Sequence, residues 1–484
     1  IWIASNGSTG SSNITVKNAN FRFSTRNQQL TLLTGVYSGN NGIGGNNSIS
    51  VQENTAANSN ISIINNEMFN VKDGININGS ATTSISPTGW KIQGNKIGTT
   101  VTAEKPVRGI YVSNALNYEI SGNTLSGIRN TENQGNDCAA IVLLGTSNGT
   151  ISSNIINDIV NTQHNNGTAS AGIFVKTTAT TNISNNIISN VYNTTADSND
   201  YNFYNKASSI FVSSGSVTNI YYNTLIASGA PNGTSRASCL YIAGGSGINV
   251  KNNIFINTQA NEQYAVFNNG GTFGQISNND YYVTNSANNF LNRIGSTLYA
   301  GTTAGTVPAS WNSAASDSNS RNILPTFTSA TDYHLQDVTA NNNLTAVAIT
   351  GITTDFDGDT RVKPYMGADE VLKCVPTGDQ TSFGNNTWTG YVYRMASNAA
   401  LPPNVAYPAL PSSTIATYIG TVTENKEFDR NVGTGAITGT TTNFACDAAP
   451  SDRFFVRYKM RTTITEAGLF SFDLGRDGGN RRFG

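Results

Sequence analysis

Three aspartates at alternate positions are the first residues in this chain whose types and spacing could do chemistry: Asp355, Asp357 and Asp359 in the segment DFDGDTR. Calcium loops begin with oxygen ligands from every second residue, with a glycine at the sixth position and a glutamate at the twelfth. Here the glycine comes fourth and Met366 stands twelfth. We therefore predict no cofactor and no metal, but a closing turn whose carboxylates cap backbone N–H groups and pair with Arg361 at the end of the fold. Calcium bound by the three aspartates is the alternative.

Catalytic pairs of acidic residues are harder to find elsewhere. Glycoside hydrolysis needs two carboxylates about 5–9.5 Å apart, and lyases need a basic residue as proton acceptor. The acids between residues 53 and 280 mostly fall singly, and the two histidines are His164 and His334. We assign no catalytic residue. A cluster could still form from four aspartates in or near long variable segments: Asp137, Asp158, Asp197 and Asp200.

Those variable segments, at about residues 126–139, 157–171, 189–208 and 226–238, also carry aromatic and basic side chains. Loops on a rigid scaffold are where binding residues concentrate, and aromatic faces with polar neighbours suit a sugar or a partner protein. The alternative is that the loops only cover a strand edge. The candidate ligand-binding residues are Tyr192, Tyr201, Phe203, Tyr204, Arg129, Lys206 and Arg236.

The elements that must position these residues are defined by a pattern that occurs eight times. It consists of a β-branched residue, two others, an asparagine, one other and a bulky apolar residue, with 26 to 37 residues between successive asparagines. Self-similarity at this period is typical of stacked repeats. The asparagines are Asn66, Asn95, Asn123, Asn154, Asn186, Asn223, Asn253 and Asn279.

A second apolar run begins 13 residues before the asparagine in six repeats, such as Ile110-Tyr111-Val112 before Asn123. Short β-rich runs broken by Gly, Asn and Ser indicate strands and turns. A strand, tight turn, strand and variable loop repeated in register is a parallel β-helix. We expect the asparagine to adopt the left-handed conformation of a corner and to form a hydrogen-bonded ladder with its equivalents. The alternative is that asparagine is merely a loop residue.

Composition narrows the function classes. Of 484 residues, 37% are hydrophobic and only 12% are charged, with a net charge of −1. This balance does not favour nucleic acid as a partner. No stretch approaches the roughly 20 apolar residues of a membrane helix, so we expect no membrane insertion. We expect the sequence to be an internal fragment of a longer protein, because it begins inside a strand-like segment.

Two parts of the chain resemble known families. The first part resembles the closing section of secreted right-handed parallel β-helix proteins of the pectate-lyase-like class. The resemblance is carried by the segments YYVTNSANNFLNR, ILPTFTSATDYHLQ, DFDGDTR and GADE, and together with the repeats it covers about residues 1–370. FFVRYKMRTTITEAGLFSFDLGRDGGNRRF resembles the first part of a PA14-type β-sandwich, a module associated with carbohydrate binding. Its usual acidic pair is here Arg476-Asp477. The combination is similar to adhesin-like surface proteins exported by type IX secretion in the Bacteroidota.

These resemblances imply an all-β chain in which a right-handed parallel β-helix with an asparagine ladder is followed by an antiparallel β-sandwich. The expected boundaries are 1–345 for the β-helix with its irregular closing segment, 346–373 for the closing motif and linker, and 374–484 for the partial sandwich. The exported context predicts a disulfide between Cys374 and Cys446. Cys138 and Cys239 lie three coils apart, about 14 Å along the axis, too far to bridge.

The sequence thus predicts a secreted or cell-surface adhesin or stalk that binds a glycan or a partner surface through loops on one edge of the β-helix. The secretion machinery would be a further partner if the chain is exported by the type IX route. Two alternatives stay open. The first is a polysaccharide lyase or glycoside hydrolase of the same fold, and the second is a purely structural spacer.

Overall fold

The computed structural model describes the chain apart from residues 6–7, 24–33, 40–55, 131–137, 163–169, 195–206, 230–236, 260–263, 285–289, 301–305, 363, 372–378, 396–415, 430–435, 445–449, 451–453 and 470–484. The chain divides into two compact units, Ile1–Val371 and Leu372–Gly484.

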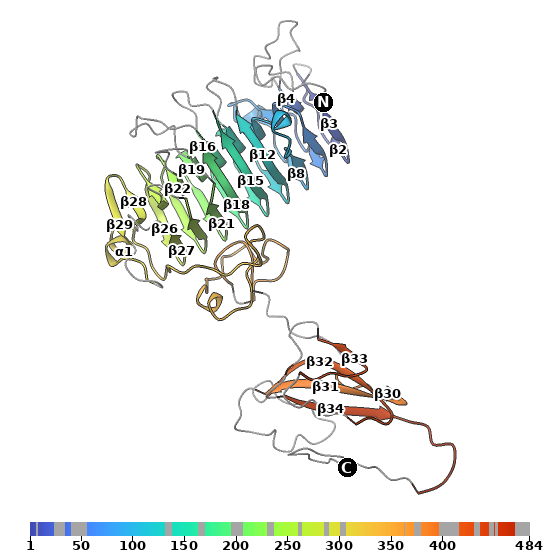
Figure 1. Ribbon diagram of the computed structural model, residues 1–484. Coiled ribbons are helices and arrows are strands. Elements are labelled where there is room, and N and C mark those ends of the chain that lie inside the picture. Colours follow the sequence, from blue (N-terminus) through green and yellow to red (C-terminus); the bar gives the residue numbers. More distant parts are fainter. Residues whose placement is uncertain are drawn as a thin grey trace. The chain divides into compact units, whose positions relative to one another are not determined.

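Three long sheets run through the first unit, and successive windings of the chain add a strand to each (Figure 1). Sheet A contains β1 (Trp2–Ile3), β4 (Thr34–Ser38), β7 (Asp73–Asn78), β10 (Arg108–Ser113), β13 (Cys138–Gly145), β16 (Ser170–Thr177), β19 (Ala207–Ser214), β22 (Ala237–Ile242), β25 (Tyr264–Asn268), β28 (Phe290–Ile294) and β29 (Thr297–Ala300). Sheet B contains β2 (Thr15–Lys17), β5 (Ser62–Ile64), β8 (Lys91–Gln93), β11 (Tyr118–Ser121), β14 (Gly149–Ser152), β17 (Thr181–Ser184), β20 (Thr218–Tyr221), β23 (Ile248–Lys251) and β26 (Phe273–Ser277). Sheet C contains β3 (Asn20–Arg22), β6 (Glu67–Phe69), β9 (Lys96–Ile97), β12 (Thr124–Asn130), β15 (Ile155–Asn161), β18 (Ile187–Asn193), β21 (Thr224–Ala227), β24 (Ile254–Asn257) and β27 (Asp280–Val283).

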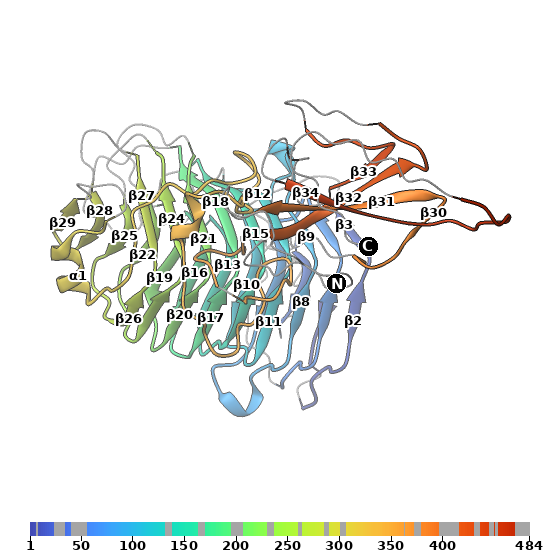
Figure 2. The same ribbon diagram turned by 90° about the horizontal axis from the view of Figure 1, so that it is seen from below.

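Neighbouring strands within each sheet are parallel, apart from the hairpin of β28 and β29. The predicted parallel β-helix is therefore confirmed, and we call this stack of coils the rod. Figure 2 shows the strands of sheet B side by side along the rod, with α1 at one end of the stack.

Identical positions of successive coils form rows inside the rod. The β-branched residue of the repeated pattern is paired in register from coil to coil in sheet B and is at most 3% exposed at every coil of the pattern. Such side chains pack well on a pleated surface, and burying one contributes about 1.5–3 kcal/mol. The row consists of Ile63, Ile92, Ile120, Ile151, Ile183, Ile220, Val250 and Ile276.

The asparagine ladder lies at the corner between sheets B and C. Each ladder side chain donates from Nδ2 to Oδ1 of the next ladder asparagine at 2.9–3.0 Å, and the backbone N–H donates to that same oxygen. Nδ2 also donates to a carbonyl of the preceding coil, as from Asn154 to Ile120 at 3.0 Å. All eight asparagines are at most 1% exposed. The ladder thus supplies partners for polar groups that the corner buries.

The left-handed residue at this corner is not the ladder asparagine, as expected, but the residue before it. None of the ladder asparagines has a positive φ, whereas the preceding residues have φ between 53° and 64°. The ladder side chain must point inward to stack, so the bend falls on its neighbour, whose side chain can point outward. These neighbours are Asn65, Gly94, Gly122, Ser153, Asn185, Tyr222, Asn252 and Asn278.

A second row of buried asparagines, which the sequence analysis did not identify, lies where sheet C ends and the chain turns to sheet A. These residues are at most 5% exposed, and they follow the ladder asparagine by seven residues or by four. Asn257, for example, donates to the carbonyls of Ala237 and Tyr264 at 3.2 and 3.1 Å. The row consists of Asn70, Asn130, Asn161, Asn193 and Asn257.

One end of the rod is closed by a short helix. The described helices are η1 (Thr83–Ile85), η2 (Thr102–Glu104), α1 (Ala309–Ala315) and η3 (Asn341–Asn343). In α1, Trp311 is fully buried and donates from Nε1 to Asp317 at 2.8 Å. Asp317 in turn accepts a hydrogen bond from the Ser320 hydroxyl, which accepts the backbone N–H of Asn279 at 3.0 Å. Ser320 therefore takes the place of a further asparagine and ends the ladder.

The second unit contains one described sheet in the order β30-β34-β31-β32-β33, in which β31 pairs antiparallel with both β32 and β34. One face buries Val392, Ile419 and Val422, and the other buries Tyr391 and Tyr393. Residues 470–484, which carry part of the PA14 resemblance, lie outside the described residues. The strands are β30 (Gly384–Asn385), β31 (Thr387–Met395), β32 (Ala416–Asn425), β33 (Thr441–Asn443) and β34 (Phe454–Arg461).

Candidate functional sites

The long-loop edge of the rod is where the chain passes from sheet C to sheet A. Of the seven predicted binding residues, Arg129 on β12 and Tyr192 on β18 are described, and they lie in register with Val160 between them. The other five, Tyr201, Phe203, Tyr204, Lys206 and Arg236, lie outside the described residues, as do Asp137, His164, Asp197 and Asp200.

Asp158 and Arg129 both lie near enough to Tyr192 for their charges to act on its hydroxyl group. Burial raises the pKa of Tyr192, the negative charge of Asp158 raises it further, and the positive charge of Arg129 opposes the rise. Asp158 also forms an ion pair with the buried Lys105. Three of the residues that the sequence placed in or near long loops, Arg129, Asp158 and Tyr192, are thus brought together on adjacent coils.

A second ion pair lies at the start of sheet A. Arg108 donates from Nε and Nη2 to the two oxygens of Asp73, each at 2.7 Å, and stacks over the Tyr111 ring at 4.8 Å. Asp73 is only 2% exposed. Both Asp73 and Asp158 already have a cationic partner, and the arginine and tyrosine groups beside them suit hydrogen bonding and stacking.

The outer face of sheet A carries a row of aromatic rings that the sequence analysis did not single out. Phe174, Phe211, Tyr241 and Phe267 stand in register on successive strands, with ring centroids 4.9–5.1 Å apart. All are at most 7% exposed, so the row is a second core rather than an open platform for a ligand. The signal in the sequence is the central residue of each apolar run, which is aromatic in these four coils.

The outer face of sheet B is polar. Asn219 accepts a hydrogen bond from Asn249 at 2.8 Å and donates to Asn182 at 2.7 Å, which makes a short ladder on the outside of the rod. A groove of about 460 Å³ lies on the same face, between Tyr118 and Asn182. This face offers amide and hydroxyl groups at the regular spacing of the strands.

After α1 and the turn that ends the ladder, residues 323–371 lie along the side of the rod rather than at its end, and we call them the closing segment. Its apolar residues Leu344 and Met366 pack on Ile226 and Ile254 of sheet C. In Figure 1 this segment runs beside β18, β21 and β27.

Three consecutive corner residues hold the closing segment. Asn185 donates to the Thr354 carbonyl at 2.8 Å, and Tyr222 and Asn252 donate to the Val347 carbonyl at 2.5 and 2.7 Å. These are the left-handed residues that precede ladder asparagines, so the outward-pointing side chains of the corner serve as anchors.

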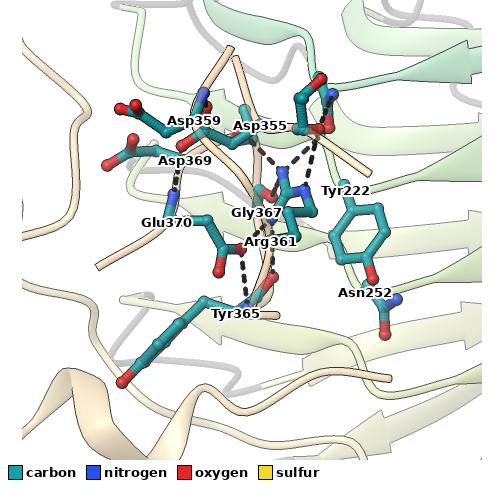
Figure 3. A network of polar contacts seen from close by, with 12 residues as sticks. Tyr222, Asn252, Asp355, Asp359, Arg361, Tyr365, Gly367, Asp369 and Glu370 are labelled. Atoms are coloured by element: carbon teal, nitrogen blue, oxygen red, sulfur yellow. Dashed lines mark hydrogen bonds and ion pairs between the residues drawn. The ribbon is translucent and has the colours of Figure 1, made fainter. Parts of the chain in front are cut away.

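Arg361 is the centre of this contact, between Tyr222 and Glu370 (Figure 3). It is 9% exposed, its guanidinium lies 4.0 Å from the centroid of the Tyr222 ring, and it pairs with Glu370. It also donates from Nη2 to Asn185 at 2.9 Å. Burial raises the pKa of Glu370 to about 6 despite the opposing charge of Arg361.

The DFDGDTR turn is capped as predicted, because Asp355 Oδ1 accepts the backbone N–H groups of Asp357 and Asp359 at 3.0 and 2.8 Å. The predicted pairing was wrong: Arg361 forms its ion pair with Glu370 rather than with the aspartates. The expected place was also wrong, since the turn docks on the side of the coils. The acid that pairs with Arg361 is thus Glu370, which stands nine residues later in the sequence GADE.

His334 lies beside this turn, with Asp332 at Nδ1 and Asp357 Oδ2 3.1 Å from Nε2. Burial lowers the pKa of His334, but the three neighbouring aspartates Asp332, Asp369 and Asp357 together raise it above its usual value. Burial raises the pKa of Asp369 to about 7. In the sequence, His334 stands only as one of two histidines, because Asp357 lies 23 positions away.

The two repeat-region cysteines are free and buried, as their separation predicted. Cys239 stands in a row of small residues that precede the apolar runs, where Gly172 has the equivalent place; a Cβ on Gly172 would lie 2.5 Å from the Ser209 carbonyl oxygen. Burial raises the pKa of Cys239 to about 12. Cys374 and Cys446 lie outside the described residues, and their disulfide stays a prediction.

No protein-family model, curated protein sequence or solved structure matches the chain. In the part of the chain that the structure describes, no helix has the length and apolar character needed to cross a bilayer.

Proposed function

We propose that this chain is a secreted or cell-surface stalk and adhesin, which binds a glycan or a partner surface through the long-loop edge of the rod. The observation that carries the proposal is the grouping of Arg129, Asp158 and Tyr192 on adjacent coils at that edge. Export by the type IX route and a carbohydrate-binding role for the second unit belong to the same proposal, through the resemblances described above.

The ladder supports the stalk part of the proposal. Hydrogen bonds link every ladder asparagine to the next from Asn66 to Asn279, and a single apolar core extends from Ile3 to Trp311. Stacked repeats that contact only their neighbours form extended scaffolds on which loops of one edge present a binding surface.

The alternative of a polysaccharide lyase or glycoside hydrolase has less support among the described residues. Three acids are described at the long-loop edge, Asp73, Glu104 and Asp158, and each is paired with a cation. A general base needs a free lone pair within reach of the substrate proton, and these carboxylates already accept hydrogen bonds from their cationic partners.

The test is a glycan array combined with a polysaccharide-cleavage assay on the wild-type chain and on two variants of the edge. One variant combines Arg129→Ala with Tyr192→Ala, and the other replaces residues 195–206 by a Gly-Ser linker of equal length. Tyr221→Ala on sheet B is the matched control, because Tyr221 is also an outward-facing tyrosine beside a ladder corner.

We expect binding without cleavage, lost at least tenfold in both edge variants and retained in Tyr221→Ala. Cleavage by the wild-type chain would favour the enzyme. If the chain shows neither binding nor cleavage, the structural spacer is the function that remains. If binding is lost equally in the control variant, the binding site is not at this edge.

A further inference from the structure

We propose that His334, Asp357 and Asp369 form a divalent-metal site that ties three parts of the closing segment together. One ligand atom from each residue lies within 4.8 Å of the other two. The three residues come from separate stretches of the chain, and the DFDGDTR turn supplies only Asp357. The site is therefore different from a calcium loop built from three alternate aspartates, since Asp355 accepts three backbone N–H groups and caps the turn.

The arrangement around His334 is the first argument. Asp332 holds Nδ1, and Nε2 faces Asp357, while Asp369 completes the group within 4.8 Å. A carboxylate on one ring nitrogen and a metal on the other is the usual setting of a metal-bound histidine, because the carboxylate fixes the ring and makes the second nitrogen more basic.

The burial of Asp369 is the second, independent argument. This residue is 3% exposed, and the described residues offer its carboxylate a single hydrogen bond, from the Leu335 N–H at 2.6 Å. A buried carboxylate with so few partners is costly unless it is protonated or bound to a cation. Asp369 forms the buried side of the site, while the side chains of His334 and Asp357 are 39% and 41% exposed and leave a path for an ion from solvent.

The donor set indicates which ion. One imidazole and two carboxylates suit Zn²⁺, which takes four ligands and binds nitrogen at about 2.0–2.1 Å and oxygen at about 2.0–2.2 Å. Calcium prefers six to eight oxygen ligands, so a site with a histidine and two aspartates favours Zn²⁺ over Ca²⁺. Three protein ligands leave one position for water, as at sites that are not purely structural.

The experiment is a titration of the full 484-residue chain, first treated with a chelator, with ZnCl₂, MnCl₂ and CaCl₂ in a calorimeter. We expect one Zn²⁺ per chain, bound at least tenfold more tightly than Ca²⁺. Asp357→Asn and His334→Gln should each weaken Zn²⁺ binding at least tenfold. Asp332→Asn should weaken it less, because Asp332 acts as a positioning residue through His334.

Asp359→Asn is the matched control, since it removes the same charge two residues away in the same turn and is outside the three-residue group. We expect its Zn²⁺ affinity to stay within twofold of wild type. Thermal unfolding in chelator should show that Asp357→Asn and Asp359→Asn are equally folded. The proposal is wrong if Zn²⁺ does not bind, if Asp357→Asn binds it as wild type does, or if Ca²⁺ binds more tightly than Zn²⁺.

Discussion

Two corners of the coil differ in length and in chemistry. Between sheets B and C every described corner consists of two residues, a left-handed residue and the ladder position, as with Ser153 and Asn154 between β14 and β15. Between sheets C and A the connection ranges from three residues after β6 to 13 residues after β18. The first corner is fixed by hydrogen bonds between coils, whereas the second tolerates loops of different lengths. Each coil thus has one corner of constant geometry and one corner of variable length.

Changing the length of each corner should test the difference between the two corners most directly. One glycine inserted between Ser153 and Asn154 shifts the following strand by one residue, turns its buried side chains outward and interrupts the ladder. We expect loss of the cooperative unfolding transition, or destabilisation by more than about 3 kcal/mol from several unpaired buried groups.

The same insertion within residues 163–169 should cost less than about 0.6 kcal/mol, because loop closure depends weakly on length. Urea unfolding followed by circular dichroism measures both values. Equal destabilisation by the two insertions would show that the two corners do not differ as we describe.

Removing one ladder side chain gives the next largest effect. Asn186→Ala removes the acceptor of the Asn154 backbone N–H, one of the acceptors of Asn154 Nδ2, and the amide that donates to the Ile151 carbonyl. We expect a loss of about 1–3 kcal/mol in the free energy of unfolding. Asn182→Ala is the control, because Asn182 belongs to the exposed ladder on sheet B and its partners can bond to water. A control that destabilises as much as Asn186→Ala would contradict the special role of the inner ladder.

A carboxylate just after the last ladder corner should make stability depend on pH. Asp280 is fully buried, with Oδ1 bonded to the Ile323 N–H at 2.8 Å and Oδ2 without a partner. Burial raises its pKa well above the usual value, against the lowering effect of the Ile323 hydrogen bond and of the nearby Arg321 charge. The folded state therefore binds the proton more tightly, and its advantage is lost as pH rises through the raised pKa.

Asp280→Asn keeps the acceptor for Ile323 and has no charge to bury. Between pH 4.5 and pH 8 we expect the variant to gain at least about 1.4 kcal/mol relative to wild type, the value of a tenfold change in a protonation constant. Chemical unfolding at the two pH values measures this, and a difference that does not grow with pH would contradict the assignment.

The rod could be predicted from the sequence because its signal is local and repeated. A β-branched residue three positions before an asparagine is buried in register, and its carbonyl accepts the ladder amide of the next coil, so one short pattern specifies both the core and the corner. The left-handed position was misplaced because Asn, Gly, Ser and Tyr all occur there, and no single residue type marks it.

The closing segment was harder to predict because its contacts join distant residues. Arg361 and Asn185 are 176 positions apart, and His334 and Asp357 come from different turns. No rule based on sequence spacing predicts contacts between residues so far apart. The motif DFDGDTR was correctly read as a capped turn, since the hydrogen bonds of Asp355 are local, but the partner of Arg361 depended on how the segment returns along the rod.

The ladder also has a direction, and this bears on how the chain is made. Each ladder amide donates to the coil that follows it in the sequence, and it also donates to a carbonyl of the coil that precedes it. A newly synthesised coil can therefore dock on its predecessor at once, and its remaining donor is satisfied when about 30 more residues have emerged. Because all these contacts join neighbouring coils, the rod can form one coil after another as the chain leaves the ribosome.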